Sequence, residues 1–203
     1  MRWSTTVFLT GVAWAVAIAA APATTSQAES PSPTPWLSVV APPNYTFQLD
    51  VLVRMQHFPW LRFHLLGTGE YEPGETYKVT FTKVPWLFPK SLNGIDLSML
   101  DPLMWPGRFL YEQTGIRDGM TLFSLHALND PALAAATVAL GPRWRARTVD
   151  ADFTNGSHIH MSITPSAVDG FLLPETLSAD IEEPHLSVSA SGDFKDYTFE
   201  PTE

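Results

Sequence analysis

Apolar and polar side chains alternate along residues 45 to 55. Tyr45, Phe47, Leu49, Val51, Val53 and Met55 occupy the odd positions, and all the positions between them are polar or charged except Leu52. Successive side chains of a β-strand point to opposite faces, so this pattern predicts one long strand with an apolar face and a solvated face. An antiparallel sheet or a curled barrel provides those two environments.

Shorter segments of the same kind follow along the chain. They cover residues 61–65, 77–83, 120–128, 136–140, 143–153, 158–163, 177–181, 186–190 and 194–199. The first three strands predict a meander, and Asn155-Gly156 predicts a two-residue type I′ hairpin. Since no helices alternate with these strands, we expect antiparallel pairing. The predicted fold is mainly β with some α: a curved antiparallel sheet, or incomplete β-barrel, of about ten strands around a short helical plug.

The plug is predicted between residues 84 and 115, where the apolar spacing changes to three and four residues. Leu92, Ile95, Met99 and Leu103 have this spacing, while four prolines keep any helix short. Asp101 followed by Pro102 is typical of a helix start. We therefore expect two short helices or turns here, with a cluster of large apolar side chains that needs to be covered.

The N-terminal 28 residues have the pattern of a secretory signal peptide. Arg2 is their one charged side chain, an apolar run extends from residue 7 to 21, and small residues precede a cleavage point after Ala28, with Ala23 as the second candidate. We expect a Pro/Ser-rich linker at 29–43 and a single domain at 44–203. The chain has no cysteine that could carry a lipid. These features predict export to the bacterial periplasm or the extracellular space, without lipidation and without a stable membrane span after signal removal.

Charge limits the classes of partner. The 203 residues carry 12 basic and 21 acidic side chains, for a formal net charge of −9, and the basic residues form no block. Nucleic acid is therefore not expected as a partner.

Catalytic motifs are weak in this chain. His158 and His160 lie two residues apart, a spacing at which both imidazoles can bind a transition metal if a neighbouring strand supplies a third ligand. The same spacing is typical of the solvent-exposed face of an amphipathic strand, and we favour this second interpretation. No nucleophile elbow and no phosphate-binding glycine loop occurs in the sequence. We expect no catalytic residue, no metal and no cofactor, and keep an enzyme of unrecognised type that uses His158 and His160 as an alternative.

Three arginines, Arg143, Arg145 and Arg147, fall at alternate positions of the predicted strand 143–153. A solvated edge strand is the usual explanation of such a pattern. The other interpretation is an anion contact at the rim of a cavity, where guanidinium groups meet an acidic headgroup.

Short motifs extend this picture. Four features occur in the order found in the outer-membrane lipoprotein carriers. They are the long first strand, the strand Gly74-Glu-Thr-Tyr77-Lys-Val79, the segment Leu100-Asp-Pro102-Leu-Met-Trp105-Pro and the late segment Gly170-Phe-Leu-Leu-Pro174. Over most of residues 45–199 the chain resembles this LolA-like family and the mycobacterial envelope lipid carriers that share its fold.

The resemblance implies an incomplete barrel around an apolar cavity that accepts acyl chains. On that basis we expect a non-catalytic carrier of a lipid or other apolar ligand, with envelope proteins as further partners. The side chains expected to line the cavity are Phe47, Leu49, Val51, Val53, Met55, Trp86, Met104 and Trp105. A packed envelope or surface protein that binds no ligand is the second alternative.

Overall fold

The computed structural model describes residues 40–58, 60–82, 94–184 and 186–200, which all lie in one unit, Thr34–Glu203. The predicted signal peptide and most of the predicted linker lie outside these residues. The described elements, in chain order, are β1 (Tyr45–Met55), β2 (Arg62–Glu72), β3 (Thr76–Phe81), β4 (Gly94–Asp96), η3 (Ser98–Leu100), η4 (Pro102–Met104), β5 (Phe109–Arg117), β6 (Met120–Ala127), β7 (Leu133–Leu140), η5 (Pro142–Trp144), β8 (Ala146–Phe153), β9 (His158–Val168), β10 (Phe171–Glu183) and β11 (Leu186–Phe199).

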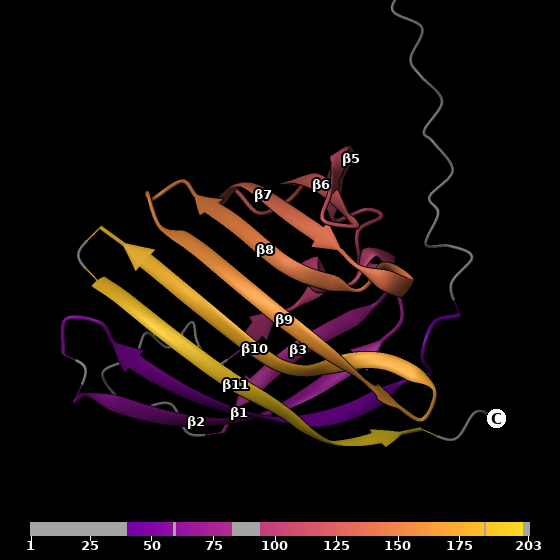
Figure 1. The fold of residues 1–203 in the computed structure, drawn as a ribbon, viewed down its shortest axis with the longest axis horizontal. Helices are drawn as coiled ribbons and strands as arrows, with labels where there is room; N and C mark the ends of the chain where they lie inside the picture. Colours follow the sequence, from indigo (N-terminus) through magenta and orange to yellow (C-terminus); the bar gives the residue numbers. More distant parts are fainter. Residues whose placement is uncertain (1–39, 59, 83–93, 185, 201–203) are drawn as a thin grey trace, which may run out of the picture. The chain divides into compact units, whose positions relative to one another are not determined.

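All eleven strands belong to one antiparallel sheet that is curved and does not close. The strand order is β4-β3-β2-β1-β11-β10-β9-β8-β7-β6-β5. Two meanders, β1 to β4 and β5 to β11, are thus joined where the first strand pairs with the last, with Val53 opposite Ala190. Figure 1 shows the long strands β8 to β11 running side by side above β1 and β2. The predicted meander of the first three strands is confirmed.

Hydrophobic alternation determines which face of the sheet is buried. Along β1 the odd-numbered residues from Tyr45 to Val53 are buried, while the residues between them are exposed or half-buried. β3 repeats the pattern with Tyr77, Val79 and Phe81. These side chains share the concave face, because the cross-strand pairs of the sheet keep them in register.

One segment crosses the concave face. Residues 97–108, which we call the crosspiece, connect β4 at one edge of the sheet to β5 at the other edge. The crosspiece contains two 3-10 turns of three residues each, and Asp101 caps the second turn as predicted, accepting a hydrogen bond from the Leu103 backbone N–H at 3.0 Å. Met104 and Trp105 at its centre are fully buried against the sheet.

Several predictions are corrected here. Residues 94–96 and 109–115 were expected in the helical plug, but they belong to the edge strands β4 and β5. The predicted strands 186–190 and 194–199 are one strand, β11.

The β8–β9 hairpin exists, but Gly156 alone of its Asn-Gly pair has a positive φ, and the Phe153 N–H bonds to the Ser157 carbonyl. The loop therefore has three residues and is not a type I′ turn.

Candidate functional site

An apolar groove lies on the concave face beside the crosspiece. Its volume is about 410 Å³, and β1, β2, β3, β4, β9, β10 and β11 all contribute to it. The lining side chains are Leu49, Val51, Val53, Leu65, Val79, Phe81, Ile95, Leu97, Ile159, Met161, Leu177, Ala179, Ile181, Glu183, Val188 and Ala190. Fifteen of these sixteen residues are apolar, and Glu183 is the exception. Pockets for small organic ligands usually have this size and this kind of lining.

Small residues on the two central strands leave this space open. Ala179 of β10 and Ala190 of β11 are cross-strand partners, and both face the groove. Gly192 follows on the same face, where an added Cβ would meet Val51 at 3.2 Å and Leu177 at 3.3 Å. Larger side chains at 179 and 190 would occupy the volume that the groove now offers.

A second groove of about 480 Å³ adjoins the first. The two share Ile95, Leu97, Ile159 and Met161 in their walls, so they form one continuous depression. The far wall of the second groove comes from the other half of the sheet, through Phe109, Leu133 and Phe153 among others. Asp96, Arg108, Asn129 and Asp130 give this groove a partly polar lining.

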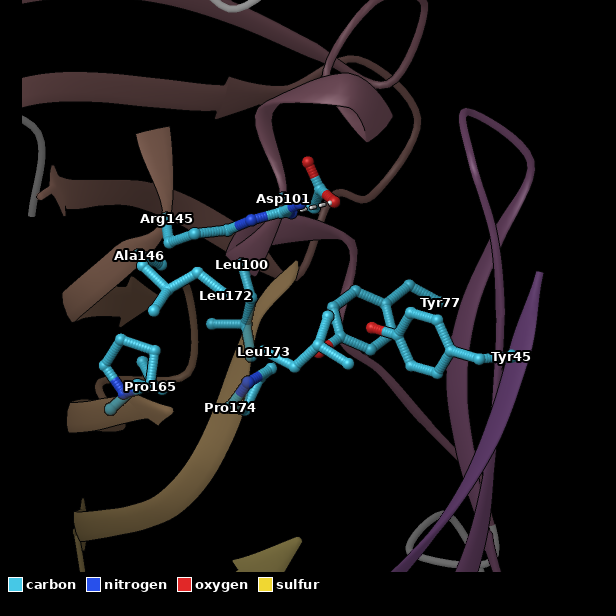
Figure 2. Close-up of a pocket in the computed structure, with 11 residues that line it drawn as sticks. Tyr45, Tyr77, Leu100, Asp101, Arg145, Ala146, Pro165, Leu172, Leu173 and Pro174 are labelled. Atoms are coloured by element: carbon cyan, nitrogen blue, oxygen red, sulfur yellow. Dashed lines mark hydrogen bonds and ion pairs between the residues drawn. The ribbon is translucent and has the colours of Figure 1, made fainter. Parts of the chain in front are cut away.

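The other end of the concave face is filled. Tyr45 stacks on Tyr71 with ring centroids 4.5 Å apart, and Phe47 packs against Tyr77 and Phe194. Burial raises the pKa of Tyr45, Tyr71, Tyr77 and Tyr197, and Tyr197 donates a hydrogen bond to the Pro174 carbonyl. A small space of about 20 Å³ is left here, enough for one water molecule. Figure 2 shows this small cavity between Tyr45, Tyr77, Leu173 and Pro174.

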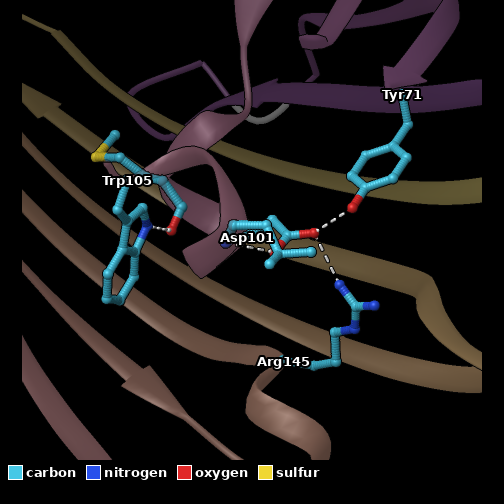
Figure 3. A network of polar contacts seen from close by, with 6 residues as sticks. Tyr71, Asp101, Trp105 and Arg145 are labelled. Atoms are coloured by element: carbon cyan, nitrogen blue, oxygen red, sulfur yellow. Dashed lines mark hydrogen bonds and ion pairs between the residues drawn. The ribbon is translucent and has the colours of Figure 1, made fainter. Parts of the chain in front are cut away.

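A buried charge pair anchors the crosspiece at the filled end. The Asp101 carboxylate, 2% exposed, accepts hydrogen bonds from the Tyr71 hydroxyl at 2.7 Å and from Arg145 Nη1 at 2.8 Å (Figure 3). Burial lowers the pKa of the Arg145 guanidinium, but Asp101 and the neighbouring phenols outweigh it, and the net pKa is raised. Trp105 Nε1 donates to the Met99 carbonyl within the crosspiece. The network joins β2, the crosspiece and the residue that precedes β8.

Three of the residues predicted to line the cavity lie in the groove wall. They are Leu49, Val51 and Val53. Phe47, Met104 and Trp105 belong to the packed core instead, and Met55 is half-buried at the end of β1. Trp86 lies outside the described residues. The prediction missed the contributions of β3 and β10, although Val79 and Phe81, like Leu177 and Ile181, stand at alternate positions of strands that the sequence does indicate.

The three arginines do not share one strand face. Arg143 and Trp144 have positive φ angles and form the turn η5, so β8 begins only at Ala146. Arg145 is mostly buried in its pair with Asp101, which leaves it no role at a solvated edge. Arg143 donates to the Gly170 carbonyl, and with Arg145 it borders a separate hollow lined by Phe171 and Leu172.

His158 and His160 lie on the convex face, away from the grooves. Ile159 and Met161 between them line the grooves, and each histidine pairs with an aspartate of β8. The Nδ1 atoms lie 2.8 Å from Asp152 and 2.6 Å from Asp150. Among the residues that the structure describes, no group of three or more His, Asp or Glu side chains is arranged to hold a metal ion. In the same part of the chain, none of the helical turns has the length and apolarity needed to span a bilayer.

Comparison with solved structures shows which fold this is. A LolA superfamily protein from Nitrosomonas europaea matches 81% of this chain and 90% of its own chain, with a TM-score of 0.55 and 10% identity. A DUF1329 family protein from Desulfovibrio piger covers 83% and 90%, with a TM-score of 0.58 and 7% identity. A putative outer membrane lipoprotein-sorting protein domain from Vibrio parahaemolyticus covers 79% and 87%, with a TM-score of 0.52 and 8% identity.

At these identities the matches establish the fold, and they confirm the LolA-like fold expected from the sequence. No known family profile and no curated protein matches the sequence.

Proposed function

We propose that this protein is a non-catalytic carrier that holds the acyl part of a lipid, or a similar apolar ligand, in the groove beside the crosspiece. The observation that carries the proposal is the groove itself, about 410 Å³ of space whose walls are apolar except for Glu183. A monomeric protein gains stability by filling such a space with its own side chains, as it does at the tyrosine-rich end. Keeping one end open while the other is packed is expected of a binding protein.

The lining favours acyl chains over polar ligands. Each methylene removed from water contributes roughly 0.8 kcal/mol, and this contribution requires no directional contact. A ligand that depends on hydrogen bonds would leave its polar groups without partners against valine, leucine and isoleucine side chains. The partly polar second groove, with Arg108 and Asn129 in its wall, is where we place the headgroup end of the ligand.

Carriage without catalysis is favoured by the chemistry of the groove walls. The described residues of the first groove include one carboxylate and neither a histidine nor a hydroxyl group. Nucleophilic catalysis by a hydroxyl or thiol usually requires a general base within hydrogen-bond reach of the nucleophile. His158 and His160, the candidate catalytic residues of the enzyme alternative, pair with aspartates on the convex face of the sheet, opposite the groove.

The site of action that we propose is the bacterial periplasm or the cell exterior. The N-terminal pattern of residues 1–28 supports export. The likeness in fold to the putative outer membrane lipoprotein-sorting protein domain from Vibrio parahaemolyticus also supports a role in the cell envelope.

A ligand-extraction experiment tests the proposal. The protein is purified without detergent from an exporting host, and organic extracts are examined by mass spectrometry for stoichiometric lipid. Binding of a series of fluorescent fatty acids is then measured. We expect each added methylene to tighten binding by about fourfold until the groove is full, the factor that corresponds to roughly 0.8 kcal/mol.

A pair of variants links any binding to the groove. Ala190→Phe places a ring in the groove, whereas Ser191→Phe places the same ring on the convex face of the same strand. We expect Ala190→Phe to reduce fatty-acid binding at least about tenfold, and Ser191→Phe to leave it unchanged. Equal binding by both variants, or no dependence on chain length in the parent protein, would contradict the proposal and favour a packed interaction protein.

A further inference from the structure

The tip of the β1–β2 hairpin carries two large aromatic side chains in solvent. Phe58 is 52% exposed and Trp60 is 76% exposed. Their rings contact each other, with centroids 5.9 Å apart and planes at 74°. Elsewhere on the described β1 and β2, apolar side chains alternate with polar ones and most of them face the core. An exposed aromatic pair at a loop tip is a marker of an interaction site.

Backbone hydrogen bonds connect the described residues of this tip to one another and to β11. The Met55 N–H bonds to the Leu61 carbonyl, the Phe58 N–H to the Met55 carbonyl, and the Leu61 N–H to the Phe58 carbonyl. The Gln56 N–H also bonds to the Ser187 carbonyl of β11 at 2.9 Å. The aromatic pair is therefore presented on a hairpin that is tied to the central strands of the sheet.

The hairpin is locally basic in an acidic protein. No acidic residue occurs from residue 51 to residue 69, while the chain as a whole carries 21 acidic and 12 basic side chains. Arg54 and Arg62 are exposed and lie directly opposite each other across the two strands. His57 at the tip is exposed as well. Glu182 and Glu183 lie at the end of β10, beside the β10–β11 turn, so the neighbouring hairpin is acidic where this one is basic.

The hairpin lies at the open end of the apolar groove. Val53 and Val188 line the groove, and Met55, the last residue of β1, pairs with Val188. The tip starts immediately beyond these residues. In Figure 1 the turns of β1–β2, β10–β11 and β8–β9 lie along the same end of the sheet, at the left of the view. The filled, tyrosine-rich end lies at the opposite ends of these strands.

We propose that the β1–β2 hairpin docks the protein on the surface of a bilayer that contains anionic lipids, with Phe58 and Trp60 inserted at the headgroup level and Arg54 and Arg62 against the lipid phosphates. Aromatic side chains with an apolar body favour the membrane–water interface, and adjacent arginines are attracted to anionic headgroups. The inference rests on the proposed function for its purpose, because docking in this orientation places the open end of the groove at the lipid surface.

Vesicle flotation tests the docking. The full chain and its variants are mixed with vesicles of phosphatidylcholine alone or of phosphatidylcholine and phosphatidylglycerol. We expect Phe58→Ala/Trp60→Ala to lower partitioning onto the mixed vesicles by roughly tenfold or more. Leu110→Ala/Ile116→Ala removes exposed apolar side chains from the edge strand β5 and is expected to have no effect. All variants share one N-terminus, so any contribution of residues 1–39 is common to them.

Two further measurements distinguish the parts of the proposal. Arg54→Gln/Arg62→Gln should abolish the preference for phosphatidylglycerol. Acyl chains brominated at their upper carbons should quench Trp60, seen as the difference between the parent protein and Trp60→Phe. Equal flotation of the parent and the aromatic variant, or no quenching of Trp60, overturns the docking; a hairpin that captures a protein partner would give this result.

Fatty-acid binding from solution, measured on the same variants, reports on the groove alone. Retention of that binding by the aromatic variant, together with lost flotation, supports docking as a function separate from ligand binding. Fatty-acid binding by a parent protein that does not float overturns the docking and leaves the carrier function intact. Flotation that depends on the hairpin, without fatty-acid binding by the parent, supports the docking and refutes the carrier function.

Discussion

Gly69 on β2 lies directly beneath the aromatic ring of Phe47, its cross-strand partner on β1. A Cβ atom at position 69 would stand 2.0 Å from Phe47 Cζ, which is far inside van der Waals contact. The ring can lie flat on the sheet because residue 69 has no side chain. A glycine within a strand is often a site of such close approach.

We predict that Gly69→Ala lowers the free energy of unfolding by about 1 to 3 kcal/mol, because the Phe47 ring must move within the packed aromatic cluster. Gly115→Ala is the matched control. This residue also lies in a strand, with no positive φ, and an added Cβ there would meet nothing within 4 Å. Urea denaturation of both variants measures the difference. Equal stability of the two variants would show that the Phe47 ring can move aside without lowering the free energy of unfolding.

At the scale of the elements, the crosspiece is fixed by few polar contacts. Asp101 connects it to Tyr71 of β2 and to Arg145, which immediately precedes β8. Both charged side chains are largely buried, with exposed fractions of 2% for Asp101 and 13% for Arg145. Removing one member of such a pair leaves the other charge without its counter-ion in a poorly solvated place.

We predict that Arg145→Met destabilises the fold by about 3 to 5 kcal/mol, since the Asp101 carboxylate loses its counter-charge. Adding Asp101→Asn to this variant removes the unpaired carboxylate charge and keeps a side-chain oxygen that accepts the hydrogen bond from the Leu103 N–H. The double variant should therefore recover a large part of the loss. A double-mutant cycle in urea gives the coupling energy. Purely additive effects would mean that the pair does not hold the crosspiece.

Most strands could be predicted from the sequence because one of their faces is buried. The alternation of β3 is strict and that of β1 is broken only at Leu52, and both strands were predicted nearly to their ends. β5 was missed because it is an edge strand whose residues are mainly exposed, so burial imposes little period on it. The turn at Arg143 and Trp144 was missed because neither residue type is typical of a positive φ.

The candidate site was predictable only in part. Alternation identified the buried face of β1, and therefore Leu49, Val51 and Val53, but it could not show where along that face the space is filled. That depends on the crosspiece, whose Met104 and Trp105 are fully buried and do not line the groove. It also depends on the pairing of β10 with β11, which brings Ala179 opposite Ala190.

At the scale of the whole sheet, the two meanders meet through strands that are far apart in sequence. Tyr45 of β1 lies opposite Phe199 of β11, and the aromatic cluster around them takes side chains from both halves of the chain. The filled end therefore stabilises the junction between β1 and β11. The same junction forms the middle of the groove wall, through Val51 and Ala190, so the packed end supports the open one.

The ionisation of this cluster gives a prediction for the whole molecule. Burial raises the pKa of Tyr45, Tyr71, Tyr77 and Tyr197 above the ordinary value for a phenol. In the unfolded chain these phenols lose their protons near pH ~10, while the folded protein keeps them, so the native state binds more protons above that pH. Stability is therefore fully present below pH ~10 and decreases as the pH rises further. Each phenol contributes a slope of up to about 1.4 kcal/mol per pH unit.

Urea denaturation between pH ~9 and pH ~11, monitored together with the ultraviolet absorbance of tyrosinate, measures this dependence. We expect the unfolding midpoint to fall steeply over this interval, and the tyrosinate signal of the cluster to rise only as the protein unfolds. Tyr197→Phe removes one titrating phenol and should make the decline shallower. A midpoint that stays constant, or tyrosinate absorbance from these phenols in the folded protein, would mean that water reaches the cluster and that this end of the sheet is not sealed.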